Sequence, residues 1–436
     1  MKKLLIIFAL ALLMNSCSWL TNEKEERLSG NRIAILKTNR SLSPDPASKN
    51  IQIHLPPPTI NDSWPQAGGY ANHAMHHLKI SDKIKKKWSI DIGKGTDDDY
   101  RLSSGPIVAD QKIFTMDAET LVSAFKFDTG SQIWEINLTP NNEDDGHVNG
   151  GLAYGAGLIF ATTGFGQVIA IEANTGKLVW RKIIGTPFRA APTYRGGRVF
   201  AQTLNNEIYA LNSKTGKELW KHSGVPEVTS ILGAASPAVG EGVVVVPYSS
   251  GQLVALRVDN GRVLWEENLS SIRRTEIVSA LSDIRGRPII DRGKVIAISH
   301  GGQIVGIDLK TGTRIWDRKI GGLESPWVSG NYIFTLTNEA EVICLSRETG
   351  SVIWVQRLPR YENQEKLKDQ IIWTGPLLAS DRLIVSGSNG EALAISPYSG
   401  KILGFIEMPD SISIPPIIAN TNILFLTNNA ELIVYH

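Results

Sequence analysis

The stretch Thr175-Gly176-Lys-Leu-Val-Trp180 decides the fold, because the chain repeats it. The same turn and tryptophan return in five further copies, at Thr129–Trp134, Thr215–Trp220, Asn260–Trp265, Thr311–Trp316 and Thr349–Trp354. A last copy, Ser399–Gly404, keeps the turn but ends in glycine instead of tryptophan. Successive tryptophans in this series lie between 38 and 51 residues apart. A period in the forties is typical of the four-stranded blade of a β-propeller.

Each repeat divides into four short strands. In the third, strands are expected to start at Pro192 and to cover 198–203, 207–211 and 217–220, with glycine and asparagine at the turns between them. Some strands alternate between apolar and polar residues, whereas Val243–Val246 is apolar throughout, as expected for a strand covered by neighbouring blades. The repeats therefore predict an all-β fold.

The ends of the repeat region predict how the ring closes. The last repeat, from Pro416 to Tyr435, has three strands and no outer strand, while Lys87–Ile92 is an outer strand with no blade of its own. Pairing the two removes both exposed edges. We therefore expect an eight-bladed β-propeller of four-stranded antiparallel blades, closed by an N-terminal strand that pairs with the last blade.

The N-terminal residues carry an export signal. Lys2 and Lys3 precede the apolar run Leu4–Leu13, whose length fits the core of a signal peptide. The following Met-Asn-Ser-Cys17 resembles a bacterial lipobox, so Cys17 is the expected lipidation site. Residues 1–17 are thus assigned to the signal peptide with its lipobox, 18–62 to a flexible tether rich in Asn, Ser and Pro, and 63–436 to the propeller.

Charge and cysteine content limit the possible partners. The chain has 45 basic and 43 acidic residues, so no field indicates nucleic acid. With Cys17 lipidated, Cys344 has no disulfide partner and is expected to be a small buried side chain on a strand. Within the tether, residues 30–36 form an apolar island that either orders on a partner or is plain linker.

Other candidate sites favour structural explanations. The segment 71–77 carries His73, His76 and His77, but no Cys, Asp or Glu within it completes a zinc site, so packing on the propeller face is expected. The acidic turns 97–99 and 143–145 lack the alternating ligand pattern of a calcium loop. No catalytic triad or phosphate-binding glycine loop is present. We expect no catalytic, metal or cofactor residues.

The repeat resembles that of quinoprotein-type propellers, in which the outer-strand tryptophan docks on the adjacent blade. Two groups share it: periplasmic quinone-dependent dehydrogenases and the BamB family of outer-membrane assembly lipoproteins. The dehydrogenases hold the quinone between a tryptophan and two adjacent disulfide-bonded cysteines, which this chain lacks. Trp327 and Trp373 are the tryptophans expected near the channel, and structural roles are favoured for both.

Two loops are similar to the BamB loops that engage BamA, the barrel-forming partner. The resemblance implies partner-binding roles for Thr229, Ile231, Leu232, Thr275, Glu276, Ile277, Leu281, Asp283 and Arg285. Leu232 replaces a frequent arginine of the family, and Arg285 replaces an acid, so the charge pairing of the interface is altered. Alternatively, Glu276 and Asp283 cap strands, and Ile277 and Leu281 fill the seam between blades.

The resemblance implies a non-catalytic scaffold subunit of the machinery that assembles outer-membrane β-barrel proteins. It would lie at the periplasmic face of the outer membrane on a lipid anchor, bind BamA and other assembly subunits, and present blade edges to unfolded client strands. No cofactor is implied. The alternatives are a periplasmic quinone-dependent dehydrogenase and a generic periplasmic ligand-binding propeller.

Overall fold

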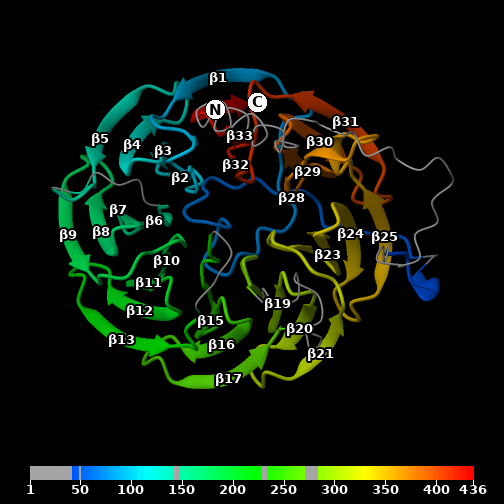
Figure 1. Ribbon diagram of the computed structural model, residues 1–436, viewed down its shortest axis with the longest axis horizontal. Coiled ribbons are helices and arrows are strands. Elements are labelled where there is room, and N and C mark those ends of the chain that lie inside the picture. The colour runs from blue at the N-terminus through cyan, green and yellow to red at the C-terminus, as the bar shows by residue number, and fades with distance from the viewer. Residues whose placement is uncertain (1–41, 49–50, 142, 144–147, 228–232, 271–282) are drawn as a thin grey trace, which may run out of the picture. The chain divides into compact units, whose positions relative to one another are not determined.

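The computed structural model describes residues 42–48, 51–141, 143, 148–227, 233–270 and 283–436. Residues 43–436 form one compact unit. This unit contains eight four-stranded antiparallel sheets that follow one another around a ring (Figure 1). The predicted eight-bladed β-propeller is therefore confirmed.

Seven blades are continuous in sequence, and each begins with its innermost strand. Blades 1 to 4 comprise β2 (Ile107–Ala109), β3 (Lys112–Met116), β4 (Leu121–Lys126) and β5 (Gln132–Asn137); β6 (Gly151–Gly155), β7 (Leu158–Thr162), β8 (Gln167–Glu172) and β9 (Leu178–Ile183); β10 (Thr193–Arg195), β11 (Arg198–Gln202), β12 (Glu207–Asn212) and β13 (Glu218–Ser223); and β14 (Ala238–Gly240), β15 (Val243–Pro247), β16 (Gln252–Arg257) and β17 (Val263–Asn268). Blades 5 to 7 comprise β18 (Ile289–Asp291), β19 (Lys294–Ile298), β20 (Ile304–Asp308) and β21 (Arg314–Arg318); β22 (Trp327–Ser329), β23 (Tyr332–Leu336), β24 (Glu341–Ser346) and β25 (Val352–Arg357); and β28 (Trp373–Ala379), β29 (Arg382–Gly387), β30 (Glu391–Ile395) and β31 (Ile402–Glu407). A hairpin of β26 (Tyr361–Asn363) and β27 (Lys368–Gln370) separates blades 6 and 7, and a 3-10 turn, η3, spans Pro46–Ser48.

Blade 8 is built from both ends of the propeller. Its three inner strands are β32 (Ile417–Ala419), β33 (Asn422–Leu426) and β34 (Glu431–Tyr435), and its outer strand is β1 (Lys86–Asp91). The strands β1 and β34 pair antiparallel, with Trp88 opposite Val434. This confirms the predicted closure: β1 gives blade 8 its outer strand, so the last blade has four strands like the others.

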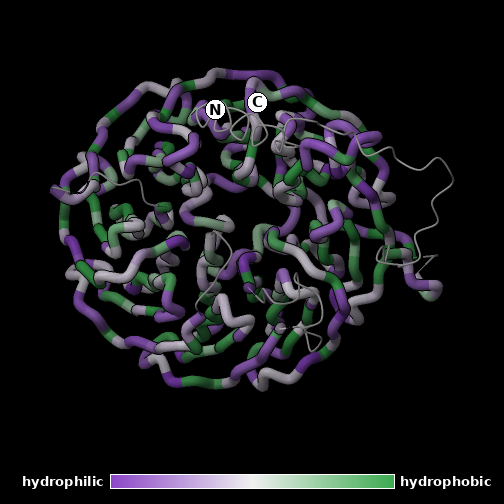
Figure 2. Tube along the Cα trace, in the orientation of Figure 1, coloured by the Kyte–Doolittle hydropathy of each residue, from purple (hydrophilic) through white to green (hydrophobic). Residues whose placement is uncertain are grey.

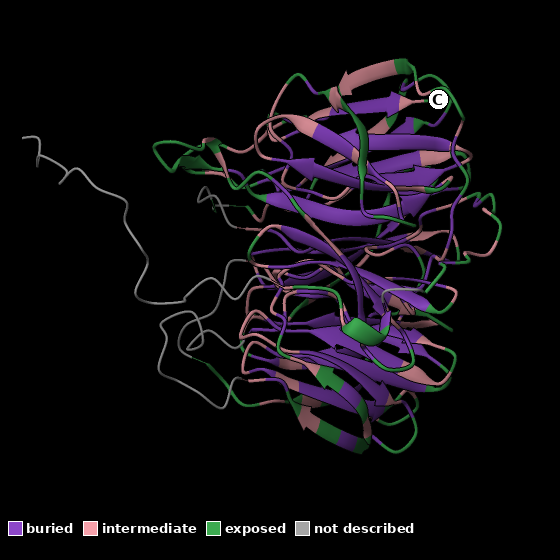
Figure 3. Ribbon diagram, turned by 90° about the vertical axis from the view of Figure 1, so that its right-hand side faces the viewer, coloured by how far each residue is buried: buried purple, intermediate pink, exposed green. Residues whose placement is uncertain are grey.

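Burial follows strand position within a blade. The second strand of blade 4, Val243–Pro247, is buried at every residue because blades cover both of its faces. Outer strands such as β9 alternate between exposed and half-buried residues. Figure 2 shows hydrophobic segments inside the ring and a mixed rim, and Figure 3 shows the buried strands between exposed loops. The core therefore lies between the blades.

The repeated tryptophans join neighbouring blades. Each of the six indole Nε1–H groups donates to a backbone carbonyl of the next blade at 2.8–3.0 Å; the pairs are Trp134 to Ala173, Trp180 to Ser213, Trp220 to Val258, Trp265 to Leu309, Trp316 to Arg347 and Trp354 to Pro397. The glycine of the next blade's Thr-Gly turn lies against the ring. A Cβ on Gly312 would lie 2.5 Å from Trp265, so only glycine fits beneath the indole.

A small residue on the third strand makes room for each tryptophan. In blade 3, Trp220 pairs with Ala210, and a β-bulge follows directly. In blade 6, Cys344 occupies the equivalent position and pairs with Trp354. Cys344 is fully buried, and burial raises the pKa of its thiol well above the ordinary value. Its expected character, a small apolar side chain on a strand, matches this position.

The repeat that lacks the tryptophan, in blade 7, precedes blade 8, in which no turn connects the third strand to the outer strand. Gly404 stands at the tryptophan position of blade 7, opposite Ala394. The neighbouring blade 8 has no Thr-Gly turn, because its outer strand β1 comes from the other end of the chain. There is thus no turn glycine there for an indole to cover, which gives a physical reason for the missing tryptophan.

Residues 61–81, here named the collar, run around the inside of the ring and bond to the inner part of every blade (Figure 1, blue). Their contacts follow ring order: Asn61 with Asn420, Trp64 with Val108, Pro65 with Tyr154, Gln66 with Tyr194, Ala71 with Val239, Asn72 with Ile290, His76 with Trp327 and Leu78 with Leu378. The collar is therefore a hub for all eight blades. Repeat analysis does not predict it.

The described part of the expected tether, residues 43–48 and 51–62, lies largely along blade 6. The backbone N–H of Asp45 donates to Val352 O at 2.9 Å, and its carboxylate pairs with Arg318 at 3.3 Å. Ile53 is buried in a cluster that includes Tyr332. These residues are thus held by backbone bonds, an ion pair and apolar packing.

Candidate functional site at the mouth of the central channel

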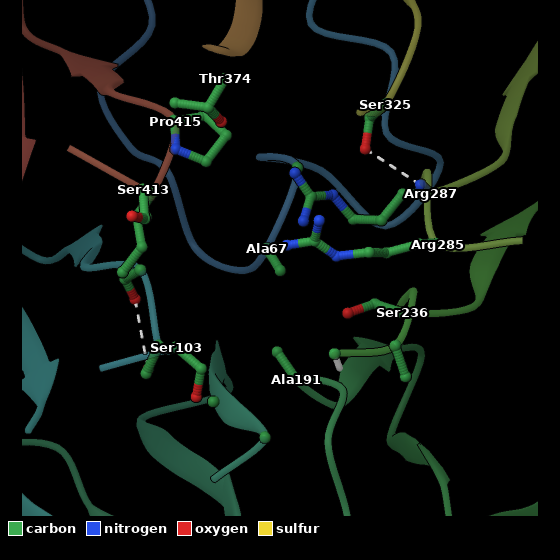
Figure 4. A pocket seen from close by; sticks show the side chains of 18 of the residues that line it. Ala67, Ser103, Ala191, Ser236, Arg285, Arg287, Ser325, Thr374, Ser413 and Pro415 are labelled. Carbon is green, nitrogen blue, oxygen red and sulfur yellow. Dashed lines mark hydrogen bonds between the residues drawn. The ribbon is translucent and has the colours of Figure 1, made fainter. Parts of the chain in front are cut away.

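A cavity of about 360 Å³ occupies the centre of the propeller (Figure 4). All eight blades line it, mainly through the segments that lead into their innermost strands. Trp64, Ala67 and Gly68 of the collar also line it, so the collar closes the channel at the inner end of the cavity. The site is a recess on the ring axis.

The ionisable groups that line this cavity are mainly basic. They are the four arginines Arg101, Arg189, Arg285 and Arg287, and one acid, Glu324. The carboxylate of Glu324 accepts hydrogen bonds from Thr374 Oγ1 at 2.9 Å and from the backbone N–H of Gly375 at 3.4 Å. The cavity therefore carries a positive formal charge.

Arg287 is held rigidly between the collar and blade 6. Its backbone N–H donates to Ser325 Oγ at 3.0 Å, and its Nε would lie 3.2 Å from a Cβ on Gly68, so glycine lets the two segments meet. Burial lowers the pKa of the guanidinium, an effect that Glu324 opposes. Figure 4 shows Arg285 and Arg287 extending into the cavity.

Most of the predicted partner-binding residues lie outside the described residues. These are Thr229, Ile231, Leu232, Thr275, Glu276, Ile277 and Leu281, together with the expected lipidation site Cys17. Asp283 and Arg285 are described.

The described ends of the two predicted loops meet at the cavity. Gly233, which ends the first loop, would place a Cβ 3.1 Å from Nε of Arg285 at the end of the second. Both residues line the cavity. Asp283 is buried, and its carbonyl accepts the backbone N–H of His300 at 2.9 Å. The prediction that the two loops share one face remains an expectation, and their described ends are adjacent.

Two of the three collar histidines, His73 and His76, contact blade 5, and His77 contacts Pro56 and blade 7. His73 Nδ1 lies 2.7 Å from Pro288 O, and His76 Nε2 lies 3.6 Å from a carboxylate oxygen of Asp291. His77 Nδ1 lies 2.7 Å from Pro56 O, and its Nε2 accepts the backbone N–H of Asp381 at 3.0 Å. Each imidazole fixes the collar to a neighbouring backbone or side chain, so the packing explanation agrees with the structure.

His73 makes the stability of the folded protein depend on pH. It is buried, and burial together with the nearby Arg287 lowers the pKa of the imidazole to about 3. The folded state therefore requires the neutral form, whereas the unfolded chain protonates near pH 6.5. The stabilisation is complete above pH 6.5 and is lost as the pH falls toward 3.

The remaining candidate positions are structural in the part of the chain that is described. The indole of Trp327 donates to His76 O at 2.6 Å, and that of Trp373 donates to Pro359 O at 2.7 Å. No group of three or more His, Cys, Asp or Glu side chains among the described residues could hold a metal ion. Within the same residues, no helix is long and apolar enough to cross a membrane.

Comparison with known proteins places the chain in a family. The family model described as outer membrane protein assembly factor BamB matches residues 118–356. BamB of Escherichia coli K12 is 30% identical over 321 residues, which cover 72% of this chain and 79% of that protein. The chain belongs to the BamB family. An uncharacterized protein of Rickettsia prowazekii is 27% identical over 271 residues, 62% of this chain and 65% of its own length, which fits the alphaproteobacterial type of BamB.

Solved structures agree on the fold. BamB from Moraxella catarrhalis superposes with a TM-score of 0.68 at 19% identity, covering 81% of this chain and all of that chain. A quinohemoprotein alcohol dehydrogenase of Pseudomonas putida superposes with a TM-score of 0.67 at 13% identity, covering 86% of this chain and 80% of that one. At these identities the matches show the shared propeller alone, so the BamB assignment depends on the sequence matches.

Sequence reasoning missed three of the four cavity arginines, Arg101, Arg189 and Arg287. The available signal was their shared place in the repeat, in the segment that leads from an outer strand to the next inner strand. Such segments lie at the channel mouth in every blade of a propeller. Because they lack a periodic pattern, their convergence becomes visible only when the ring is closed.

Proposed function

We propose that this BamB-family chain is a non-catalytic scaffold subunit of the outer-membrane β-barrel assembly machinery. It binds BamA through the 229–233 and 275–285 loops, and lipid on Cys17 anchors it at the periplasmic face of the outer membrane. The observation that carries the proposal is the family match together with the adjacency of Gly233 and Arg285, which brings the described ends of both loops to one rim.

The ring supports a binding role because it fixes the described segments that flank the two loops. The tryptophan contacts between blades, the pairing of β1 with β34 and the collar fix the segments from which the loops extend. Binding residues concentrate on loops that such a rigid scaffold positions. The half-buried Arg285 at the end of the second loop offers a positive charge that a partner can complement.

The outer edges of the blades support a second contact, with unfolded clients. The outer strand β31 of blade 7 has one unpaired edge and exposes Ile402, Leu403 and Phe405, the last with 59% of its surface accessible. Pairing at such an edge uses backbone hydrogen bonds and tolerates many client sequences.

Co-purification from detergent-solubilised outer membrane tests the proposal. Wild type should recover BamA, and the double charge reversal Glu276→Lys with Arg285→Glu should reduce recovery about 10-fold or more, since close charge pairs at interfaces contribute at least about 1.5 kcal/mol. Lys401→Glu, an exposed charge reversal directly before the outer strand β31 of blade 7, is the matched control and should recover BamA like wild type. Equal recovery by all three proteins would refute the loop assignment, and absence of BamA from the wild-type sample would refute the function.

A further inference from the structure

Three of the four arginines of the central cavity, Arg101, Arg189 and Arg287, lie outside the two loops of the proposed BamA contact and are not explained by it. Arg101, Arg189, Arg285 and Arg287 come from blades 1, 3 and 5 and line one recess. Cations gathered in a partly buried space repel one another, and this repulsion is weakly screened away from bulk water. Such an arrangement is stabilised when an anion occupies the space.

Arginines outside the cavity differ from those that line it. The buried or half-buried arginines outside the cavity each have an oxygen partner: Arg198 with Asp259, Arg314 with Glu267, Arg318 with Asp45, Arg347 with Asp291 and Arg382 with the carbonyl of Asp82. Among the described residues, the half-buried side chains of Arg189, Arg285 and Arg287 have no ion pair or hydrogen bond within the protein. The buried Nε of Arg287 is itself without a partner there. Their missing acceptors are therefore a property of the cavity.

Hydroxyl groups complete the lining. Ser325 Oγ accepts the backbone N–H of Arg287 at 3.0 Å, and Ser413 Oγ accepts Asn428 Nδ2 at 3.0 Å. Because both oxygens already accept, their O–H protons remain to donate to a ligand oxygen. Figure 4 shows both serines at the cavity.

We propose that this cavity binds a small, multiply charged anion whose phosphate or carboxylate oxygens accept hydrogen bonds from Arg101, Arg189, Arg285 and Arg287. The guanidinium fork matches such oxygens two at a time. The volume of about 360 Å³ lies within the range of small-molecule sites. The collar closes the inner end, so the anion enters from the mouth. The site shares Arg285 with the proposed BamA contact, whereas Arg101, Arg189 and Arg287 lie outside both loops, so Arg189 and Arg287 are the positions at which anion binding is tested.

Isothermal titration calorimetry on the purified mature protein at low salt tests the proposal, with inorganic pyrophosphate as the phosphate probe and citrate as the carboxylate probe. Binding of at least one probe is expected. Arg287→Gln and Arg189→Gln should each weaken it about 10- to 100-fold, since a charge-assisted hydrogen bond is lost. Arg262→Gln, which removes an exposed arginine outside the cavity, is the matched control and should bind like wild type.

A second arm separates a free anion from a lipid headgroup. Suppose that the protein co-sediments with phosphatidylglycerol vesicles, that Arg189→Gln abolishes this, and that free pyrophosphate does not bind. These results would identify the ligand as the phosphate of a lipid and would support the site. Melting curves check that each variant is folded, and Arg189→Gln substitutes for Arg287→Gln if the latter unfolds.

Absence of binding to all three probes would overturn the proposal, as would equal binding by the cavity variants and the control. The proposal would also be overturned if wild type bound no probe and Arg287→Gln lost BamA recovery. That result would assign the arginines to a carboxylate of the protein partner.

Discussion

Replacing Gly312 with alanine tests the contact that joins the blades. Gly312 has φ +74° and lies beneath Trp265, so an added Cβ would lie 2.5 Å from Cγ of the indole. Gly293 is the matched control, because it has φ +69° and a Cβ there would meet nothing within 4 Å. Both substitutions carry the same backbone strain, of about 1 kcal/mol.

The added cost at Gly312 comes from displacing Trp265. The indole donates to Leu309 O at 2.8 Å, a bond that contributes about 1 kcal/mol. Complete loss of a buried tryptophan costs about 3–5 kcal/mol, and partial displacement costs a fraction of that. We therefore expect Gly312→Ala to lower the free energy of unfolding by about 3 kcal/mol, and Gly293→Ala by about 1 kcal/mol.

Urea unfolding followed by circular dichroism measures both values, and a double-mutant cycle isolates the contact. In a Trp265→Ala background, Gly312→Ala should cost only the strain of about 1 kcal/mol, because no indole remains to displace. Equal losses in the free energy of unfolding for Gly312→Ala and Gly293→Ala in the wild-type background would refute the described contact between Gly312 and Trp265. So would a cost at Gly312 that does not depend on Trp265.

Substitutions at three further positions have defined outcomes in the same unfolding assay. His73→Asn keeps a side-chain donor at a residue with φ +60°. Because the pKa of His73 is lowered to about 3, the free energy of unfolding of wild type should fall by about 2 kcal/mol between pH 8 and pH 5. The variant should show none of this fall. Cys344→Ala should cost less than about 1.5 kcal/mol, since alanine fills this slot in other blades, whereas Cys344→Leu should cost about 1–3 kcal/mol by overpacking beneath Trp354. Gly404→Trp should change stability by less than about 0.5 kcal/mol, because blade 8 has no turn glycine to receive the indole; a clear gain would contradict that explanation.

The periodic part of the fold was predictable from the sequence. The turn that includes Gly176 and ends at Trp180 recurs in blades 1 to 6, and each recurrence marks the same bulge, the same tryptophan contact with the next blade and the same hairpin. The closing strand was predictable as well, because Trp88 begins an outer strand that lacks a blade and the last repeat lacks an outer strand. In both cases a local pattern determines the structure.

The collar and the cavity could not be predicted in this way. Residues 61–81 bond to eight different blades, in all but one case through their own backbone, and no spacing in the sequence encodes contacts such as Asn61 with Asn420. The cavity arginines converge only because the ring returns on itself, so Arg101 and Arg287 share a space despite their separation along the chain. The family resemblance identified the partner loops, but most of their residues lie outside those the structure describes.

Site-specific photocrosslinking in cells tests the central claim, that the channel-mouth rim of this propeller faces BamA. A photoreactive benzoylphenylalanine would replace Arg285 at the rim in one strain and the exposed Lys401, directly before the outer strand β31 of blade 7, in another. The account predicts a BamA adduct from position 285 and none from position 401. An adduct from position 401 alone would contradict it.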